Sequence, residues 1–347
     1  SLHDALPIYA VTWNKAESGA AVLVNIATGE ILSMASFPDF NPNNRDGAVL
    51  DDFRNRAISD TFEPGSTVKP LVIMTALQQG IVQPDSVIDT HPFNVDGHRI
   101  RDVGFYPELS LTGILQKSSD TGVSHLSLAM PVQKLLDTYK SFGFGDPTGL
   151  GLTGESSGLM PQRRYWSDLD RATFAFGYGL MVTPLQLAHV YATIGSFGIY
   201  RPLSITRIDP PVIGTRVMPE ALVHQVEHMM ESVALPGGGG TKAAVRDYRV
   251  AVKTGTAKKI GDDGKYVDKY VAYTAGVAPA SDPKFALVVV INNPQNGAYY
   301  GGAVSAPVFS QIMGDVLRLE NVKPDGMPAD SDHLLVMHGS SVSSPSM

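Results

Sequence analysis

Apolar residues are spaced as in strands near both ends of the chain. Near the N-terminus, GAAVLVNI (19–26) is rich in small and β-branched residues, and ILSMAS follows a turn at Thr28 and Gly29. This pattern predicts a β-hairpin. From residue 249 onward, three further runs, RVAVKTGTA, KYVAYTAGVAP and KFALVVVIN, are separated by turn residues. They predict an antiparallel meander.

The middle of the chain has the spacing of helices. The run LVIMTAL (71–77) is apolar on nearly all sides, which predicts a buried helix that ends at Gly80. Thr183 and Pro184 are typical of a helix N-cap and first helical position, with a stop near Gly195 or Gly198. Further helices are predicted within about 111–143 and over about 219–233 and 306–319.

Strands at both ends with helices between them predict one sheet closed by the two termini. The predicted class is α/β of the α+β type: a central, mostly antiparallel five-stranded sheet flanked by helices, with an inserted all-helical subdomain over about 81–245. Within this domain, 15–320, the segments 37–61 and 81–109 are expected to lack regular structure, the first as a long ordered surface segment. Residues 1–14 are interpreted as the edge of a truncation or cloning, and 321–347 as a disordered tail.

Composition narrows the classes of function. With 347 residues and 43% hydrophobic content, the chain can bury a large core. A net charge of −7 with no basic cluster argues against nucleic acid as a partner. The absence of cysteine excludes disulfides, thiolate catalysis and cysteine-based zinc sites. No apolar run reaches the length of a membrane span, and the N-terminus lacks a signal-peptide pattern.

The stretch FEPGSTVKP (62–70) places a hydroxyl and an amine where a helix begins. Positions three apart share one helix face, so Ser66 and Lys69 are expected to lie side by side, with the amine accepting the hydroxyl proton. Pro70 fits only the first turn of a helix, which puts Ser66 at or near its N-terminus. There, unpaired backbone N–H groups stabilise a developing negative charge.

Two other motifs can complete a site with this pair. The first is KTGT (253–256) at a predicted strand end, where Lys253 and the threonine hydroxyls suit a carboxylate and Gly255 permits close approach. The second is SSD (118–120), where a serine can relay a proton or simply cap a helix. Each motif alone is also explained by ordinary structure. The three in this order match the set of penicillin-binding proteins and class A β-lactamases.

With these motifs and the stretches RNRAISDTFEPGSTVKP, FGYGLMVTPLQLAHVYATIG and YYGGAVSAPVF, the chain resembles the transpeptidase domain of class B penicillin-binding proteins. The likeness is greatest to the septal, FtsI-like peptidoglycan D,D-transpeptidases and covers about residues 15–320. It implies the serine β-lactamase and D,D-peptidase fold, and an enzyme of the bacterial inner membrane with its catalytic domain in the periplasm. The implied partners are stem peptides ending in D-Ala-D-Ala, β-lactams, and divisome membrane proteins including a glycan polymerase; no cofactor or metal is implied.

The resemblance also implies a role for each matching residue. Ser66 is the acylated nucleophile, Lys69 its base, and Ser118 with Lys253 relays the proton to the leaving group. The backbone N–H groups of Ser66 and Thr256 form the oxyanion hole. The substrate is bound by Asp120, Thr254, Gly255 and Thr256, and Tyr299 and Tyr300 form an aromatic wall.

One position departs from the septal pattern, which has asparagine where this chain has Asp120. An ionised carboxylate only accepts hydrogen bonds, whereas an amide also donates them. Its charge favours a protonated lysine nearby and opposes the neutral amine that a general base needs. Class B enzymes of the elongation type do use Ser-x-Asp, so the subtype stays open.

Three alternatives remain. His224 and His228 fit the H-x-x-E-H pattern of some zinc peptidases, although a solvated helix explains them more simply. A serine β-lactamase would share the three motifs, but the E-x-x-L-N segment of class A enzymes is absent between the second and third of them. A β-lactam-sensing receptor domain would share the fold and the acylation without turnover.

Overall fold

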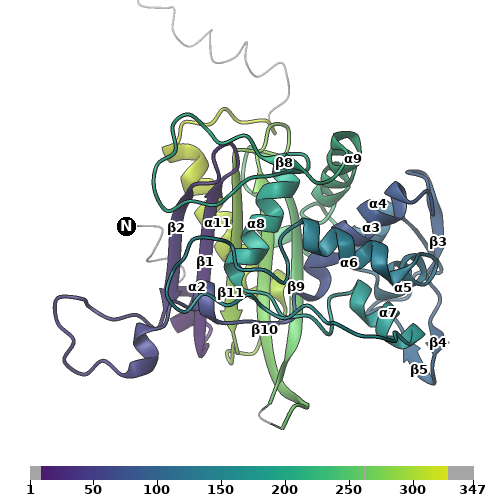
Figure 1. Ribbon diagram of the computed structural model, residues 1–347, viewed down its shortest axis with the longest axis horizontal. Coiled ribbons are helices and arrows are strands. Elements are labelled where there is room, and N and C mark those ends of the chain that lie inside the picture. The colour runs from purple at the N-terminus through teal and green to yellow at the C-terminus, as the bar shows by residue number, and fades with distance from the viewer. Residues whose placement is uncertain (1–8, 262, 327–347) are drawn as a thin grey trace, which may run out of the picture.

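Five antiparallel strands form the central sheet of the molecule (Figure 1), which a computed structural model describes over residues 9–261 and 263–326. The strand order is β2-β1-β11-β10-β9, and β1 pairs along its length with β11, with Ser18 opposite Asn292. The predicted hairpin and meander therefore join in one sheet, which confirms the predicted sheet. The strands are β1 (Ser18–Asn25), β2 (Ile31–Phe37), β9 (Ala251–Ile260), β10 (Tyr266–Ala278) and β11 (Phe285–Asn292).

Two helices cover opposite faces of this sheet. In β10, Val277 lies against Gly195 of α8 (Pro184–Gly195), and the next residue, Gly276, lies against Phe309 of α11 (Ala306–Leu319). Consecutive side chains of a strand point to opposite faces, so α8 and α11 enclose the sheet. The predicted cap of α8 is confirmed, because the Thr183 hydroxyl accepts the N–H of Gln186.

A second group of helices lies beside β9, at the right of Figure 1. It includes the helices predicted within 111–143, and α9 falls within the range predicted for it. Besides α8 and α11, the helices and short 3-10 turns include η1 (Leu50–Phe53), α2 (Arg56–Ser59), η2 (Gly65–Val68), α3 (Lys69–Gln78), α4 (Leu111–Lys117), α5 (Asp120–Leu128), α6 (Val132–Ser141), α7 (Asp168–Ala175), α9 (Glu220–Glu231), η3 (Thr241–Ala243) and α10 (Gly301–Val304).

The prediction of an all-helical insertion over 81–245 was wrong in two respects. The segment 81–109, expected to be irregular, forms two short ladders, because packing against the neighbouring helices α4 and α5 brings these short strands together. Helix α8 also lies within that range but packs on the sheet. The short strands are β3 (Val87–Asp89), β4 (Phe93–Val95), β5 (His98–Ile100), β6 (Glu108–Ser110), β7 (Ile199–Tyr200) and β8 (Thr215–Arg216).

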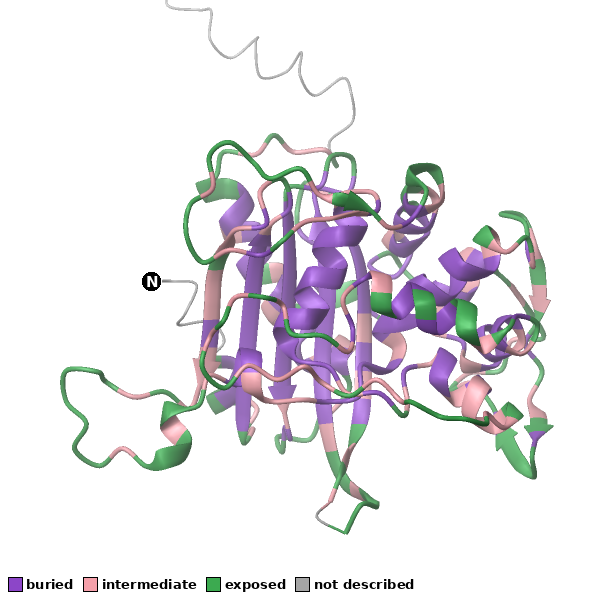
Figure 2. Cartoon of the chain, viewed as in Figure 1, coloured by how far each residue is buried: buried purple, intermediate pink, exposed green. Residues whose placement is uncertain are grey.

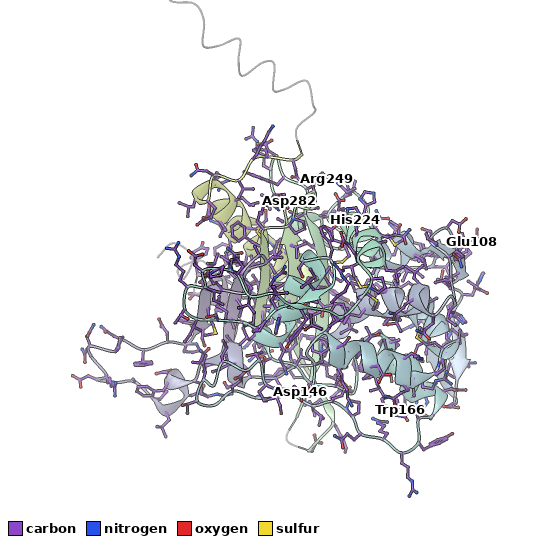
Figure 3. The ribbon with its side chains drawn as sticks, turned by 45° about the horizontal axis from the view of Figure 1, so that its top comes forward. Glu108, Asp146, Trp166, His224, Arg249 and Asp282 are labelled. Carbon is purple, nitrogen blue, oxygen red and sulfur yellow. The ribbon has the colours of Figure 1, made fainter. Side chains whose placement is uncertain are left out.

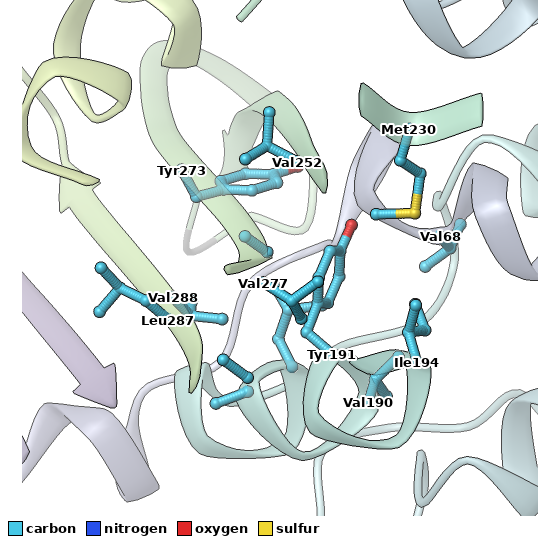
Figure 4. Close-up of a cluster of buried hydrophobic side chains, with 14 of the residues drawn as sticks. Val68, Val190, Tyr191, Ile194, Met230, Val252, Tyr273, Val277, Leu287 and Val288 are labelled. Atoms are coloured by element: carbon cyan, nitrogen blue, oxygen red, sulfur yellow. The ribbon is translucent and has the colours of Figure 1, made fainter. Parts of the chain in front are cut away.

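The buried core runs from the sheet into the second group of helices (Figure 2). Figure 4 shows Tyr191 of α8 and Tyr273 of β10 within it, and both are fully buried. Their hydroxyls donate to the carbonyl oxygens of Thr67 and Glu63 respectively. The core tyrosines thus hold both sides of the turn that carries Ser66.

At both ends of the described chain, residues outside the predicted domain pack on it or bind to it. Val11, in the expected edge of the chain, is buried against Gly19. Residues 321–326 of the expected tail are bound to the domain, since Val322 accepts the hydroxyl of Tyr248 and Asp325 accepts the N–H of Arg249. The expectation of disorder was wrong for these residues, and 327–347 lie outside the described chain. No helix in the described ranges has the length and apolar character needed to cross a membrane.

Candidate active site

Ser66 lies in the turn η2, directly before α3, as the sequence predicts. A close backbone contact holds the turn in place: the N–H of Gly65 donates to the carbonyl oxygen of Gly177 at 3.3 Å. A Cβ atom on Gly177 would lie 2.3–2.5 Å from backbone atoms of Gly65. Glycine is therefore needed at 177 for the turn to take this position.

Ser118 connects the nucleophile to both lysines of the site. Its hydroxyl donates to Ser66 Oγ at 2.9 Å and accepts from Lys253 Nζ at 3.0 Å and Lys69 Nζ at 3.2 Å. A hydroxyl has one donor hydrogen and two lone pairs, so these three bonds use its full capacity. The arrangement can carry a proton between Ser66 and either amine.

The local sequence explains how Ser118 reaches this position. It joins α4 to α5 in the left-handed conformation, with φ 56° and ψ 46°. Ser119 then caps α5, and its side chain accepts the N–H of Gly122. The two serines of SSD thus have different places: Ser119 caps the helix, and Ser118 is hydrogen-bonded to Ser66, where a proton relay would need it.

Lys69 does not contact Ser66 in the way that the helix spacing predicts. Its amine lies 2.6 Å from Asp120 Oδ1 and 2.6 Å from the carbonyl oxygen of Ser118, and no hydrogen bond to Ser66 is formed among the described residues. Lys69 is fully buried. A buried ammonium is strongly attracted to a carboxylate, and this ion pair turns the amine toward Asp120.

Lys253 is the second buried amine of the site and has no exposed surface. Burial, followed by the charge of Lys69, lowers the pKa of Lys253 well below its usual value, and the charge of Asp120 opposes this effect. Lys253 therefore gives up its proton more readily than an exposed lysine does. The surroundings of Lys253 therefore favour its neutral form.

Strand β9 brings the KTGT motif to the edge of the sheet beside Ser66. Side chains alternate along a strand, so Lys253 lies on one face and the hydroxyls of Thr254 and Thr256 on the other. Thr256 Oγ1 accepts the N–H of Gly301 at 2.9 Å and keeps its own hydrogen for another partner. The motif therefore presents a buried amine on one face of β9 and two hydroxyls on the other.

Gly255 fits the prediction that this strand needs a glycine, but for a different reason. A Cβ atom there would lie 2.1 Å from the ring of Tyr273, and one on Gly65 would lie 3.9 Å from the carbonyl oxygen of Thr256. The ring of Tyr273, a core residue, occupies the space that a side chain at 255 would need.

The two tyrosines predicted as an aromatic wall lie next to the third motif. Tyr299 stacks on Tyr270 with ring centroids 4.2 Å apart, and its ring is 4.4 Å from that of Tyr300. Tyr300 directly precedes Gly301, which is bound to Thr256. Tyr270 is a third ring of this stack that the sequence analysis did not single out, because its place opposite Lys258 on β9 follows only from the pairing of the strands.

Glu63 is a further residue of the site that the sequence analysis did not single out. Its buried carboxylate accepts the N–H of Gly179 at 2.8 Å and the hydroxyl of Tyr266 at 3.0 Å. Burial raises the pKa of Glu63, while these hydrogen bonds oppose the rise. A charged residue three positions before Ser66 in an apolar stretch was the signal in the sequence.

The histidines of the H-x-x-E-H pattern lie on α9, away from Ser66. His224 packs on the ring of Phe197, and His228 bonds to Glu231 at 2.6 Å. Figure 3 labels His224 near Arg249, which also binds Glu231. In residues 9–261 and 263–326, no three histidine, aspartate or glutamate side chains are arranged to hold a metal ion.

Glu227 of the same helix is expected to make stability depend on pH. Burial and the charge of Glu231 raise its pKa from 4.5 to about 8, against the opposing charge of Arg249. Between these values the folded chain holds a proton that the unfolded chain releases, so stability falls as pH rises from about 5 to 8. The free energy of unfolding should fall by on the order of 4 kcal/mol over this range. Glu227→Gln should remove this fall, as measured by denaturant unfolding at several pH values.

Glu220→Gln is the matched control, because Glu220 is exposed on the same helix and paired with Arg216. Its stability relative to the original chain should stay constant over this pH range. A constant difference for Glu227→Gln as well would contradict the prediction.

The fold and this cluster around Ser66 are those of a penicillin binding protein transpeptidase domain. The model of that family matches residues 19–314, and the chain belongs to this family. It is 65% identical to the peptidoglycan D,D-transpeptidase FtsI of Escherichia coli (strain K12) over 95% of this chain and 56% of that protein. It is 39% identical to the probable peptidoglycan D,D-transpeptidase PenA of Neisseria gonorrhoeae over 91% of this chain and 54% of that protein.

A solved structure has the same fold. The apo structure of the TP domain from Burkholderia pseudomallei penicillin-binding protein 3 superposes with a TM-score of 0.85 at 34% identity, covering 94% of this chain and 97% of that one. This match confirms the predicted fold class. The chain spans 56% of the length of the Escherichia coli relative.

Proposed function

We propose that this chain catalyses peptidoglycan D,D-transpeptidation through an acyl-enzyme on Ser66. In this reaction Ser66 attacks the carbonyl of the penultimate D-alanine of a stem peptide, and the terminal D-alanine leaves. The amine of a neighbouring stem peptide then takes the acyl group and forms the cross-link. The observation that carries the proposal is the hydrogen-bonded group in which Ser118 joins Ser66 to Lys69 and Lys253.

The residues divide the work as follows. For the reaction the hydrogen bonds reverse: one amine is neutral, the Ser118 hydroxyl turns from Ser66 to donate to that amine, and the Ser66 hydroxyl donates to the Ser118 oxygen. The Ser66 proton then passes to Ser118 as Ser118 gives its own proton to the amine, and the reverse transfer protonates the leaving amine. The lowered pKa of Lys253 suits it to accept that proton. The backbone N–H groups of Ser66 and Thr256 stabilise the tetrahedral oxyanion. The hydroxyls of Thr254 and Thr256 bind the terminal carboxylate at the edge of β9.

The relatives also suggest where the reaction takes place. The name FtsI of the Escherichia coli relative, and the resemblance of the three motifs, support a role in septal cell-wall synthesis by an inner-membrane protein whose catalytic domain faces the periplasm. The same reasoning extends to β-lactams as inhibitors that acylate Ser66. Divisome membrane proteins, including a glycan polymerase, are the proposed protein partners.

Labelling with fluorescent penicillin tests this function against its two alternatives. The expected result is a covalent label that Ser66→Ala abolishes and that is retained for hours, together with exchange of a terminal D-alanine for another D-amino acid. Rapid release of the label would instead identify a β-lactamase. A stable label without exchange would identify a sensor domain.

Asp120→Asn should keep or raise the rate of acylation by penicillin at neutral pH. The carboxylate holds the Lys69 amine 2.6 Å away in an ion pair, and the amide would remove that charge while still accepting a hydrogen bond. The second-order acylation rate constant measures the effect, with Asp137→Asn on α6 as a control of equal charge. A many-fold loss for Asp120→Asn alone would refute this account of the residue.

A further inference from the structure

The conformation of Ser118 requires support from outside the SSD motif. Its φ of 56° lies in the left-handed region, which costs a non-glycine residue on the order of 1 kcal/mol or more. Such a conformation persists only where the surrounding structure fixes it. The Ser118 hydroxyl depends on it, because the turn between α4 and α5 sets where this side chain points.

Asp102 supplies this support from a different segment of the chain. Its carboxylate accepts the hydroxyl of Ser119 at 2.6 Å, the backbone N–H of Thr121 at 2.9 Å and the hydroxyl of Thr121 at 2.8 Å. Hydrogen bonds to a carboxylate are about twice as strong as neutral ones. The three bonds fix the residues immediately after Ser118.

The position of Asp102 also suits the helix that it binds. Its carboxylate lies at the N-terminal end of α5, where the helix dipole stabilises negative charge and where backbone N–H groups lack partners within the helix. Ser119 uses its hydroxyl as acceptor for Gly122 and as donor to Asp102. The helix cap and the Asp102 contact therefore form one unit.

Apolar burial holds the preceding hairpin, where Ile100 belongs to a buried cluster that Leu128 of α5 packs against, but the loop that follows is held by polar contacts. Asp102 lies between β5 and β6, and the next residue, Val103, is 98% exposed. The contacts of Asp102 with Ser119 and Thr121 are polar and directed at the second motif. Among the described residues, its hydrogen bonds do not reach Ser66 or either lysine of the site.

We infer that Asp102 is a positioning residue for the reaction proposed above: it holds the turn 118–120 so that the Ser118 hydroxyl faces Ser66 and Asp120 faces Lys69. It acts only through Ser119 and Thr121. The inference rests on the proposed function for its catalytic meaning, while its structural part stands independently.

Asp102→Ala and Asp102→Asn test the inference on the whole chain. Acylation by benzylpenicillin is followed at increasing concentrations, which separates the acylation rate constant at saturation from the binding constant. Asp102→Ala should lower the saturated rate about 100-fold, the effect of a misplaced catalytic group, with little change in binding. Asp102→Asn keeps an acceptor for the Thr121 N–H and should lose less.

Asp96→Ala is the matched control. Asp96 accepts the N–H of Leu169 in the first turn of α7, so it also binds a helix start in the same group of helices but does not touch the second motif. It should leave the acylation rate unchanged. If both variants lost acylation rate in proportion to their loss of melting temperature, the inference would be overturned, because stability alone would explain the rates.

A double-mutant cycle tests whether Asp102 acts through Ser119. In the Ser119→Ala background, Asp102→Ala should lower the rate by a smaller factor than in the original chain, because one of its contacts is already gone. Equal factors in both backgrounds would overturn action through Ser119.

Crystal structures of the original chain and of Asp102→Ala provide a readout that does not depend on activity. In the variant, the Ser118 backbone should leave the left-handed region and the Ser118 and Ser66 hydroxyl oxygens should separate beyond hydrogen-bonding distance. An unchanged turn would overturn the inference even if the rate fell. Failure of penicillin to label the original chain would instead refute the proposed function, and the structural result would still decide the role of Asp102.

Discussion

Ser118→Ala should lower the rate of acylation by penicillin about 1,000-fold, within the range that a positioned proton-transfer group contributes. The Ser118 oxygen is bonded to Ser66 and to both lysines, so the variant breaks every described proton path between them. Stopped-flow measurement with a chromogenic cephalosporin gives the rate.

The melting temperature should change little in the same variant, because the lost hydroxyl belongs to the site and alanine keeps the backbone. Ser124→Ala is a suitable control, since Ser124 is a buried serine of α5 that donates to the carbonyl oxygen of Ala172. A tenfold loss or less for Ser118→Ala would mean that Ser66 loses its proton by another route.

Gly177→Ala should reduce both stability and acylation, the second by about 100-fold. Gly177 has φ 88°, where a side chain costs about 1–3 kcal/mol, and its Cβ would meet the backbone of Gly65 at 2.3–2.5 Å. Backbone atoms cannot move aside as a flexible side chain can. The Ser66 turn must therefore shift, and thermal unfolding and penicillin acylation should both report the change.

Gly97→Ala separates the two causes. Gly97 has φ 78°, but a Cβ atom there would have no neighbour within 4 Å. It should lose stability through backbone strain alone and keep its acylation rate. Equal acylation rates for Gly177→Ala and Gly97→Ala would show that contact with Gly65 does not position the nucleophile.

Much of the fold follows from local signals in the sequence. The alternation in β9–β11, the cap at Thr183 and the stop at Gly80 each depend on neighbouring residues, and the structure confirms all three. The position of Ser66 before a buried helix follows in the same way from Pro70, which is acceptable only in a first turn.

The remaining features depend on contacts between distant segments. The closeness of Asp120 to a lysine of the site was expected from the resemblance alone. Helix spacing places Lys69 near Ser66 and does not include a carboxylate 51 residues away. Glu63 and Gly179 meet across 116 residues, and Asp102 meets the second motif through a loop without a recognisable pattern. Short ladders such as β3 with β6 likewise form only once the surrounding helices bring them together.

Strand β9 is the last in the sheet order, so one of its edges is not paired with another strand of the sheet. This edge could also pair with another copy of the domain. An unpaired strand edge offers a row of N–H and C=O groups to any extended peptide, so an edge that receives a substrate is equally open to the strand of another molecule. Lys258 and Lys259 lie further along this strand, where they pair with Asp268 and Glu17. Charged side chains on an edge strand oppose edge-to-edge pairing. In the proposed function the KTGT part of β9 would receive the peptide, while the charged residues further along the strand oppose pairing with another copy of the chain.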